Sequence, residues 1–148
     1  MADNIPDRYF PQYAEQDAWD DKDLRDFVTN FYRLSDKAED NQNWVDSFTQ
    51  DARVQIGADK AQGSQEISDF RTRMWAHVQE RKHTVLKVFP GRFTKPDGSE
   101  RECMLLGEAN FLTRDGRSIE AQWSAHAVVS KVQDQWRFAQ YRVWVQND

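Results

Sequence analysis

Residues 117–131, RSIEAQWSAHAVVSK, alternate apolar and polar side chains from Ile119 to Ala127. A period of two is the signature of a β-strand, in which successive side chains point to opposite faces of a sheet. The apolar set, which we expect to face the core and a pocket, comprises Ile119, Ala121, Trp123, Ala125, Ala127 and Val129. The other set, which we expect to face solvent or a partner, comprises Glu120, Gln122, Ser124, His126 and Val128.

Three further strand-like runs flank this one, at residues 82–93, 101–113 and 136–145. Turn residues separate them: Pro96-Asp97-Gly98, Asp115-Gly116 and residues 133–135. Proline presets φ and glycine accepts positive φ, so these segments favour tight connections between antiparallel strands. Long strands twist and curve. The second half of the chain is therefore predicted to be a mostly antiparallel meander that curls around a pocket. Tyr141 joins that pocket if a bulge shifts the register of the last strand.

The run at 101–113 is apolar on both faces, which predicts burial on both sides and favours a homo-oligomer, with a dimer preferred. Glu108 and Asn110 share one face of it with Met104 and Leu106. Polar groups among apolar walls are typical of a ligand pocket. The alternative is a structural ion pair of Glu108 with one of three arginines, Arg71, Arg73 or Arg142.

Helical periodicity dominates the first half. A helix begins after Asp20 or Asp21, either of which can cap it, and Asp36 follows near its end. One face of this helix carries Leu24, Phe27, Val28, Phe31 and Tyr32. A helical turn at 44–48, a strand at 52–56, a loop at 58–63 and a second long helix capped by Ser64 follow. Residues 1–20 read as an irregular arm, and residues 21–148 as a single α+β domain.

Composition excludes several classes of function. Net charge is −5 without a basic stripe, which argues against nucleic-acid binding. The single cysteine, Cys103, lies in an apolar run and reads as a buried, inert thiol. We expect no signal peptide, no membrane span and a cytoplasmic location. His77, His83 and His126 have no metal-ligand spacing, and no nucleotide fingerprint occurs, so no metal and no cofactor are expected.

The order of several motifs carries a family resemblance. Phe31-Tyr32 precedes Asp36, then come WVDSF at 44–48, DARV at 51–54, Gly63 with Ile67, and QWRF at 135–138. Over roughly residues 22–146 the chain resembles the nuclear-transport-factor-2-like superfamily, in its SnoaL-like and scytalone-dehydratase-like branch. The resemblance implies a cone-shaped sheet around N-terminal helices and a common tendency to oligomerise. Many members are enzymes without metal or organic cofactor, and others only bind proteins.

The resemblance also suggests site residues. Scytalone dehydratase uses one Asp and two His, and these fall near Asp40, on His83 and near Asn110. Its assisting Asn falls near Ala125, and its tyrosines fall near Glu39 and Ile56. Only the aspartate and the first histidine are retained, which favours a relative with another substrate.

The leading candidate base is His83, because imidazole exchanges protons near neutral pH. Asp40 or Asp36 would orient it, and Asn110 or Glu108 would hold or protonate a substrate oxygen. Trp123, Tyr141 and Tyr32 are predicted to contact the substrate. His126 lies on the outer face by alternation.

These residues predict a small cofactor-independent SnoaL-like enzyme that cyclises, isomerises or dehydrates a hydrophobic polyketide- or terpenoid-type metabolite by proton transfer. One alternative is a non-catalytic module that binds a hydrophobic ligand or a protein. Another is an epoxide-hydrolase-like hydrolase, for which Asp36, Arg142 and Glu108 would activate water.

Overall fold

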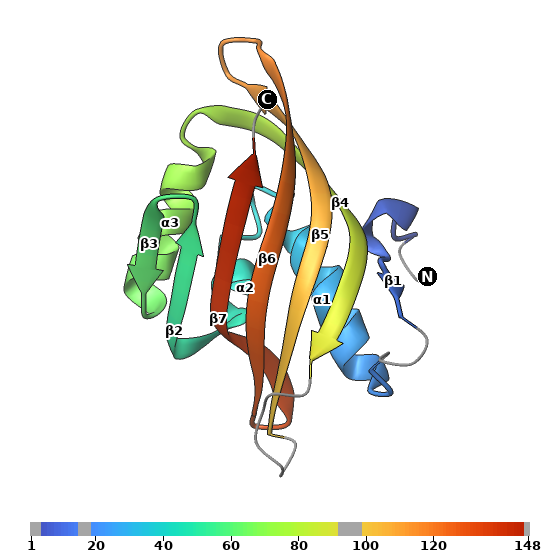
Figure 1. Ribbon diagram of the computed structural model, residues 1–148. Coiled ribbons are helices and arrows are strands. Elements are labelled where there is room, and N and C mark those ends of the chain that lie inside the picture. Colours follow the sequence, from blue (N-terminus) through green and yellow to red (C-terminus); the bar gives the residue numbers. More distant parts are fainter. Residues whose placement is uncertain (1–3, 15–18, 92–98, 147–148) are drawn as a thin grey trace.

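The computed structural model describes residues 4–14, 19–91 and 99–146. Within them one sheet has the strand order β1-β4-β5-β6-β7-β2-β3, and the helices cover one of its faces (Figure 1). The curved sheet packed on N-terminal helices is the predicted α+β architecture. The predicted turn at 96–98 and the end of the run at 82–93 lie outside the described residues.

The centre of the sheet is an antiparallel meander. It consists of β4 (Val78–Gly91), β5 (Glu100–Thr113), β6 (Ser118–Val132) and β7 (Gln135–Gln146). Alternation in β6 is as predicted, since its apolar set from Ala121 to Val129 is buried against the helices. Most of the core therefore lies between the inner face of this meander and the helical layer.

The sheet is mixed, because two strands outside the meander pair with it in parallel. Strand β2 (Phe48–Ile56) runs parallel to β7, and β1 (Gln12–Tyr13) runs parallel to β4. Two expectations need correction here. The predicted loop at 58–63 contains strand β3 (Asp59–Gln62), which forms a hairpin with β2 through Gly57 at φ 61°. The N-terminal arm is also not wholly irregular, since it contributes β1 and a 3-10 turn at Asp7–Tyr9.

Three helices cover the inner face: α1 (Lys22–Ser35), α2 (Asn41–Asp46) and α3 (Ser64–Trp75). Asp21 caps α1 by accepting a 3.1 Å hydrogen bond from the amide of Leu24. The predicted apolar face of α1 is turned to the core, where the ring of Phe31 meets those of Phe138 and Tyr141 edge-on at 4.7 and 5.3 Å.

A buried cation joins α3 to the end of α1. Arg71 is fully buried and donates to the carbonyl oxygens of Leu34, Ser35 and Lys37 and to Asn41 Oδ1. The Ser35 carbonyl belongs to the last turn of α1, where carbonyls lack a helical partner, whereas those of Leu34 and Lys37 also accept from the amides of Lys37 and Asp40. The predicted pairing of Glu108 with Arg71 is therefore wrong, because the guanidinium is engaged here.

A bulge in β7 sets which of its side chains face inward. The β6–β7 register shifts between Phe138, opposite Val129, and Gln140, opposite Val128. One extra residue turns the strand's inward set from even to odd positions. Phe138 and Tyr141 are consequently both buried, as the bulge hypothesis predicted.

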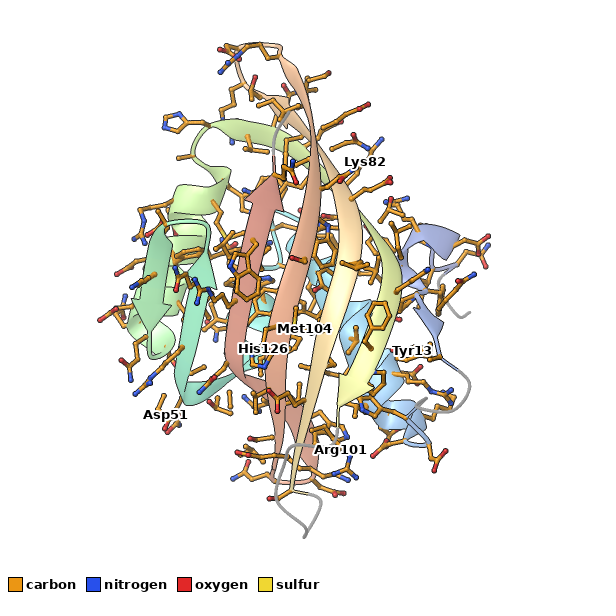
Figure 2. All side chains as sticks on the ribbon, in the orientation of Figure 1. Tyr13, Asp51, Lys82, Arg101, Met104 and His126 are labelled. Carbon is orange, nitrogen blue, oxygen red and sulfur yellow. The ribbon has the colours of Figure 1, made fainter. Side chains whose placement is uncertain are left out.

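The outer face of β5 is open in the single chain. Met104 and Leu106 are 39% and 42% exposed, and Figure 2 shows Met104 beside His126 on this face. The prediction that β5 is buried on both sides is thus wrong for one chain. A homodimer that covers this face stays a prediction, and light scattering tests it against a monomer mass of 17.5 kDa.

Candidate active site

A small cavity of about 60 Å³ lies between α1, α2 and the inner face of the sheet. Its apolar wall includes Phe111, Trp123 and Val143. Its polar lining consists of the four side chains Ser35, Arg81, His83 and Tyr141. An apolar hollow with a few convergent polar groups is the usual form of a small-molecule site.

His83 and Asp36 form a close pair beside this cavity. The distance from His83 Nδ1 to Asp36 Oδ1 is 2.5 Å, and the two side chains are only 15% and 6% exposed. Asp36 Oδ2 also accepts from the backbone amide of His83 at 2.8 Å. With Nδ1–H donating to the carboxylate, Nε2 is the ring nitrogen left to accept a proton from another molecule. The pair therefore has the form of a base oriented by a carboxylate.

Helix α1, Arg71 and the N-terminal arm together fix the position of Asp36. Asp36 is the residue directly after α1, whose last carbonyls are held by Arg71. The N-terminal arm adds a third hydrogen bond, because Tyr9 Oη donates to Asp36 Oδ2 at 2.6 Å. Burial and the Asp36 charge raise the pKa of Tyr9 to about 12, so this phenol remains a donor at neutral pH.

The sequence leaves open whether Asp36 or Asp40 orients His83. The structure places Asp36 beside the histidine. Asp40 lies at the start of α2, and its backbone amide and carbonyl bond to Lys37 and Trp44. The prediction of Asp40 as partner of His83 is wrong, because the contacts of the histidine go to Asp36.

An aromatic layer supports the histidine. The rings of Trp123 and Tyr32 stack at 5.2 Å with 25° between their planes, and His83 lies edge-on to Trp123 at 6.0 Å. Tyr32 and Tyr141 share a 2.9 Å hydrogen bond between their hydroxyls, and burial raises the pKa of both. Of the three predicted contact residues, Trp123 and Tyr141 line the cavity, whereas Tyr32 does not line it and stacks on Trp123.

The wall has room for Trp123 because a glycine faces it. Gly107 is paired with Trp123 across β5 and β6, and a Cβ on Gly107 would lie 2.1 Å from the indole. The indole N–H donates to the carbonyl oxygen of Glu108 at 3.0 Å. The orientation of the indole is thereby fixed from two sides.

The side chains of Glu108 and Asn110 are on the other face of β5. Both are exposed, because alternation that puts Gly107 and Ala109 inside puts these two outside. The prediction that they hold a substrate oxygen in the cavity is therefore wrong. The hydrolase arrangement fails for the same reason, since Arg142 lies on the outer face of β7, its guanidinium over the Trp144 ring, away from Asp36.

Sequence reasoning missed Arg81. It stands two residues before His83 in β4, so both side chains face the cavity. Burial lowers the pKa of its guanidinium to about 10, which leaves it charged at neutral pH. Arg81 precedes the predicted run at 82–93, and the signal that could have found it is the alternation of β4, which starts four residues earlier at Val78.

His126, predicted to lie outside, is on the outer face and pairs with Glu102 at 2.5 Å between Nε2 and Oε1. Across residues 4–14, 19–91 and 99–146, no group of three His, Cys, Asp or Glu side chains could hold a metal ion. Over the same ranges no helix is long and apolar enough to cross a membrane.

Comparison with known proteins supports the fold. No family model and no curated protein match the chain. Among solved structures, a candidate aromatic ring hydroxylase from Novosphingobium aromaticivorans has a TM-score of 0.76 and 16% identity, covering 85% of this chain and 91% of its own. A candidate scytalone dehydratase from the same organism has a TM-score of 0.75 and 12% identity, covering 84% and 83%. A hexachlorocyclohexane dehydrochlorinase, LinA type 2, has a TM-score of 0.73 and 12% identity, covering 85% and 86%.

These likenesses define the class of protein by its fold. The chain has the nuclear-transport-factor-2-like fold, also described as cystatin-like, as the order of its motifs predicted. Identities of 11–16% show the fold and not the substrate.

Proposed function

We propose that this chain is a cofactor-independent enzyme that isomerises, cyclises or dehydrates a small hydrophobic metabolite by proton transfer. The observation that carries the proposal is the His83–Asp36 pair at the edge of a small, largely apolar cavity. Named dehydratase and dehydrochlorinase structures with this fold support an elimination or a related proton transfer.

In the proposed mechanism, His83 Nε2 removes a proton from a substrate carbon. Asp36 stabilises the imidazolium that forms, and its contacts with Tyr9 and with the His83 amide keep the carboxylate in place during the transfer. The imidazolium then returns the proton to another carbon, which completes an isomerisation, or to a departing hydroxyl, which completes a dehydration. His83 thus both takes up and returns the proton, so neither reaction needs a second proton donor or acceptor.

The size of the cavity limits the substrate. About 60 Å³ holds a few water molecules, whereas sites for drug-sized ligands measure roughly 300–1,000 Å³. A ring-sized substrate therefore requires movement of lining side chains. Met74 is suited to this, because it lines the cavity, is unbranched and is partly exposed. Val145, 42% exposed, marks an end of the cavity that reaches solvent.

The experiment is hydrogen–deuterium exchange at the acidic carbon of a cyclic ketone probe, 1-indanone, followed by proton NMR. Wild-type protein should accelerate exchange above buffer. His83→Ala should reduce the protein-dependent rate about 10²-fold or more, because it removes the base. Asp36→Asn should reduce it at least tenfold, because the imidazolium loses its counter-charge while the side chain keeps its size.

A matched control comes from the outer face. His126 has the same 2.5 Å contact with a carboxylate but lies on the opposite side of the sheet from the cavity. His126→Ala should therefore leave the exchange rate unchanged. Equal losses in His126→Ala and His83→Ala would mean that the rate reports general histidine catalysis or damage to the fold, and the proposed site would be rejected.

A result without catalysis leads to the second function. If wild-type protein binds 1-indanone, seen as a change in tryptophan fluorescence, but does not accelerate its exchange or that of related ketones, the cavity is a binding site. The non-catalytic module then replaces the enzyme.

A further inference from the structure

Arg81 has more hydrogen-bond donors than the fold uses. A guanidinium carries five N–H donors. Nη2 donates to the carbonyl oxygen of Met74 at 2.7 Å, and among the described residues no second acceptor lies within hydrogen-bond distance. The Nε atom is buried without any partner there. Unmet buried donors cost stability, so their retention at a cavity calls for an explanation.

The charge of Arg81 is not neutralised by a direct ion pair within the described residues. Asp36 is the carboxylate whose charge acts on it, and the oxygens of Asp36 are occupied by Tyr9 and His83. Asp36 also acts on the buried Arg71, together with Asp40 and Glu39, so the carboxylate whose charge acts on Arg81 is shared with a second guanidinium. Among the described residues, Arg81 therefore lines the cavity without a carboxylate of its own.

The guanidinium is also held in place without being neutralised. Its central carbon lies 5.3 Å from the ring of Trp75 and 5.1 Å from that of Phe111. Aromatic faces attract a cation but accept no N–H bond of carboxylate strength. Arg71 differs, since its donors are engaged with backbone carbonyls and an amide oxygen. Arg71 thus serves the fold, and Arg81 presents a fixed cation to the cavity.

We propose that Arg81 binds an anionic oxygen of the ligand beside His83, so that the substrate is a carbonyl compound that reacts through an enolate. When Nε2 of His83 takes the proton from the carbon next to the carbonyl, the C–H electron pair moves to the carbonyl oxygen. The N–H donors of Arg81 then hold that oxyanion until the electrons return and a new C–H bond forms or a β-hydroxyl leaves. This inference rests on the proposed function for the place of the substrate.

The competing explanation is that Arg81 only caps helix α3. A neighbour allows the two to be separated. Arg114 donates to the carbonyl oxygens of Ala76 and Trp75 at 3.2 and 3.3 Å, at the same end of α3, but does not line the cavity. If Arg81 only caps the helix, Arg81→Met and Arg114→Met should have similar effects on stability and on anion binding. An anion site predicts a loss of anion binding in Arg81→Met only.

The test compares benzoate with benzamide, which have nearly the same shape but differ in charge, by isothermal titration calorimetry on the full chain. Wild-type protein should bind benzoate at least tenfold more tightly than benzamide. Arg81→Met should bind the two within about twofold of each other, and Arg114→Met should keep the wild-type ratio.

Equal binding of the two probes to wild type, no binding of either, or a benzoate preference that survives Arg81→Met would each overturn the proposal. Thermal unfolding of each variant verifies that it folds. If Arg81→Met is unstable, Arg81→Lys takes its place; because lysine keeps the charge, this variant should keep part of the benzoate preference. The assay needs no turnover. Failure of ketone exchange with an intact benzoate preference would reject the enzyme but keep the anion site, and the reverse pattern would reject the anion site alone.

Discussion

Replacing Arg71 with methionine should destabilise the fold more than any surface change on the same helix. Arg71 is fully buried, donates four hydrogen bonds, and lies 5.2 and 5.3 Å from the rings of Trp44 and Trp75. Methionine fills most of the volume and keeps the apolar contacts. The loss is therefore confined to the guanidinium and to the acceptors that it satisfies.

The magnitude follows from the acceptors left behind. The Ser35 carbonyl loses a charged donor in a buried position, and the partly buried carbonyls of Leu34 and Lys37 lose one of the two donors that they accept. Hydrogen bonds to charged groups contribute about 1.5–3 kcal/mol each, but relief of the buried charge offsets part of the total; burial already lowers the pKa of Arg71 to about 10. The expected net loss is about 3–5 kcal/mol. For a domain of this size that lowers Tm by about 6–20 °C.

The assay is urea and thermal unfolding followed by circular dichroism, with Arg73→Met as the matched control. Arg73 stands two residues further along α3 and makes a surface ion pair with Asp59 at 3.3 Å, both side chains being about half exposed. Its loss should cost less than about 1 kcal/mol. Arg71→Lys should fall between the two, because an ammonium keeps the charge but lacks the planar fork. If Arg71→Met and Arg73→Met differ by less than about 1 kcal/mol, the buried cap does not stabilise the fold and the reasoning fails.

Three further outcomes are expected. Gly107→Ala should cost about 1–3 kcal/mol in urea unfolding and alter tryptophan fluorescence, because the new Cβ would lie 2.1 Å from Trp123 and 2.6 Å from a backbone oxygen; an unchanged midpoint would contradict this. All four tyrosines have raised pKa values, that of Tyr9 being about 12, so the folded protein should show no phenolate absorbance near pH 10. Stability should fall as pH rises from 10 through 12, because the tyrosines of the unfolded chain ionise first. Half-ionisation of the folded protein at pH 10 would refute this. Burial raises the pKa of Cys103 to about 12, so iodoacetamide should label it at mildly alkaline pH only after unfolding, as mass spectrometry would show.

The parts of the fold predicted from sequence are those in which one face is clearly apolar. Strand β6 and helix α1 have one buried and one polar side, so period alone fixes their orientation. From the sequence, a bulge in β7 is a hypothesis whose position cannot be given, because that position depends on how β7 pairs with β6. The two-residue edge strand β1 was not predicted, because so short a strand is fixed by tertiary contacts rather than by local pattern. The parallel pairing of β2 with β7 was not predicted either, because it joins segments far apart in the sequence.

The errors in the site have equally specific causes. Strand β5 is apolar on both faces, so alternation does not distinguish its inner face from its outer face, and the predicted inward position of Glu108 is wrong. The deciding feature is Gly107, which must face inward because Trp123 occupies the space that its Cβ would need. Asp36 and Asp40 could not be separated by spacing along the chain. Asp36 is distinguished by its hydrogen bonds with Tyr9 and His83, which are far from both aspartates in sequence.

The requirements of folding and of the proposed chemistry meet at the end of α1. Arg71 fixes the last carbonyls of the helix, and the next residue, Asp36, is the carboxylate that orients His83. Tyr9 reaches the same carboxylate from the N-terminal arm, so three separate segments of the chain determine one tautomer. A base held in this way does not have to reorganise during proton transfer, which is the condition under which a small site without a cofactor can be effective. It follows that the cap at Arg71 and the reactivity of His83 are coupled through the position of a single helix end.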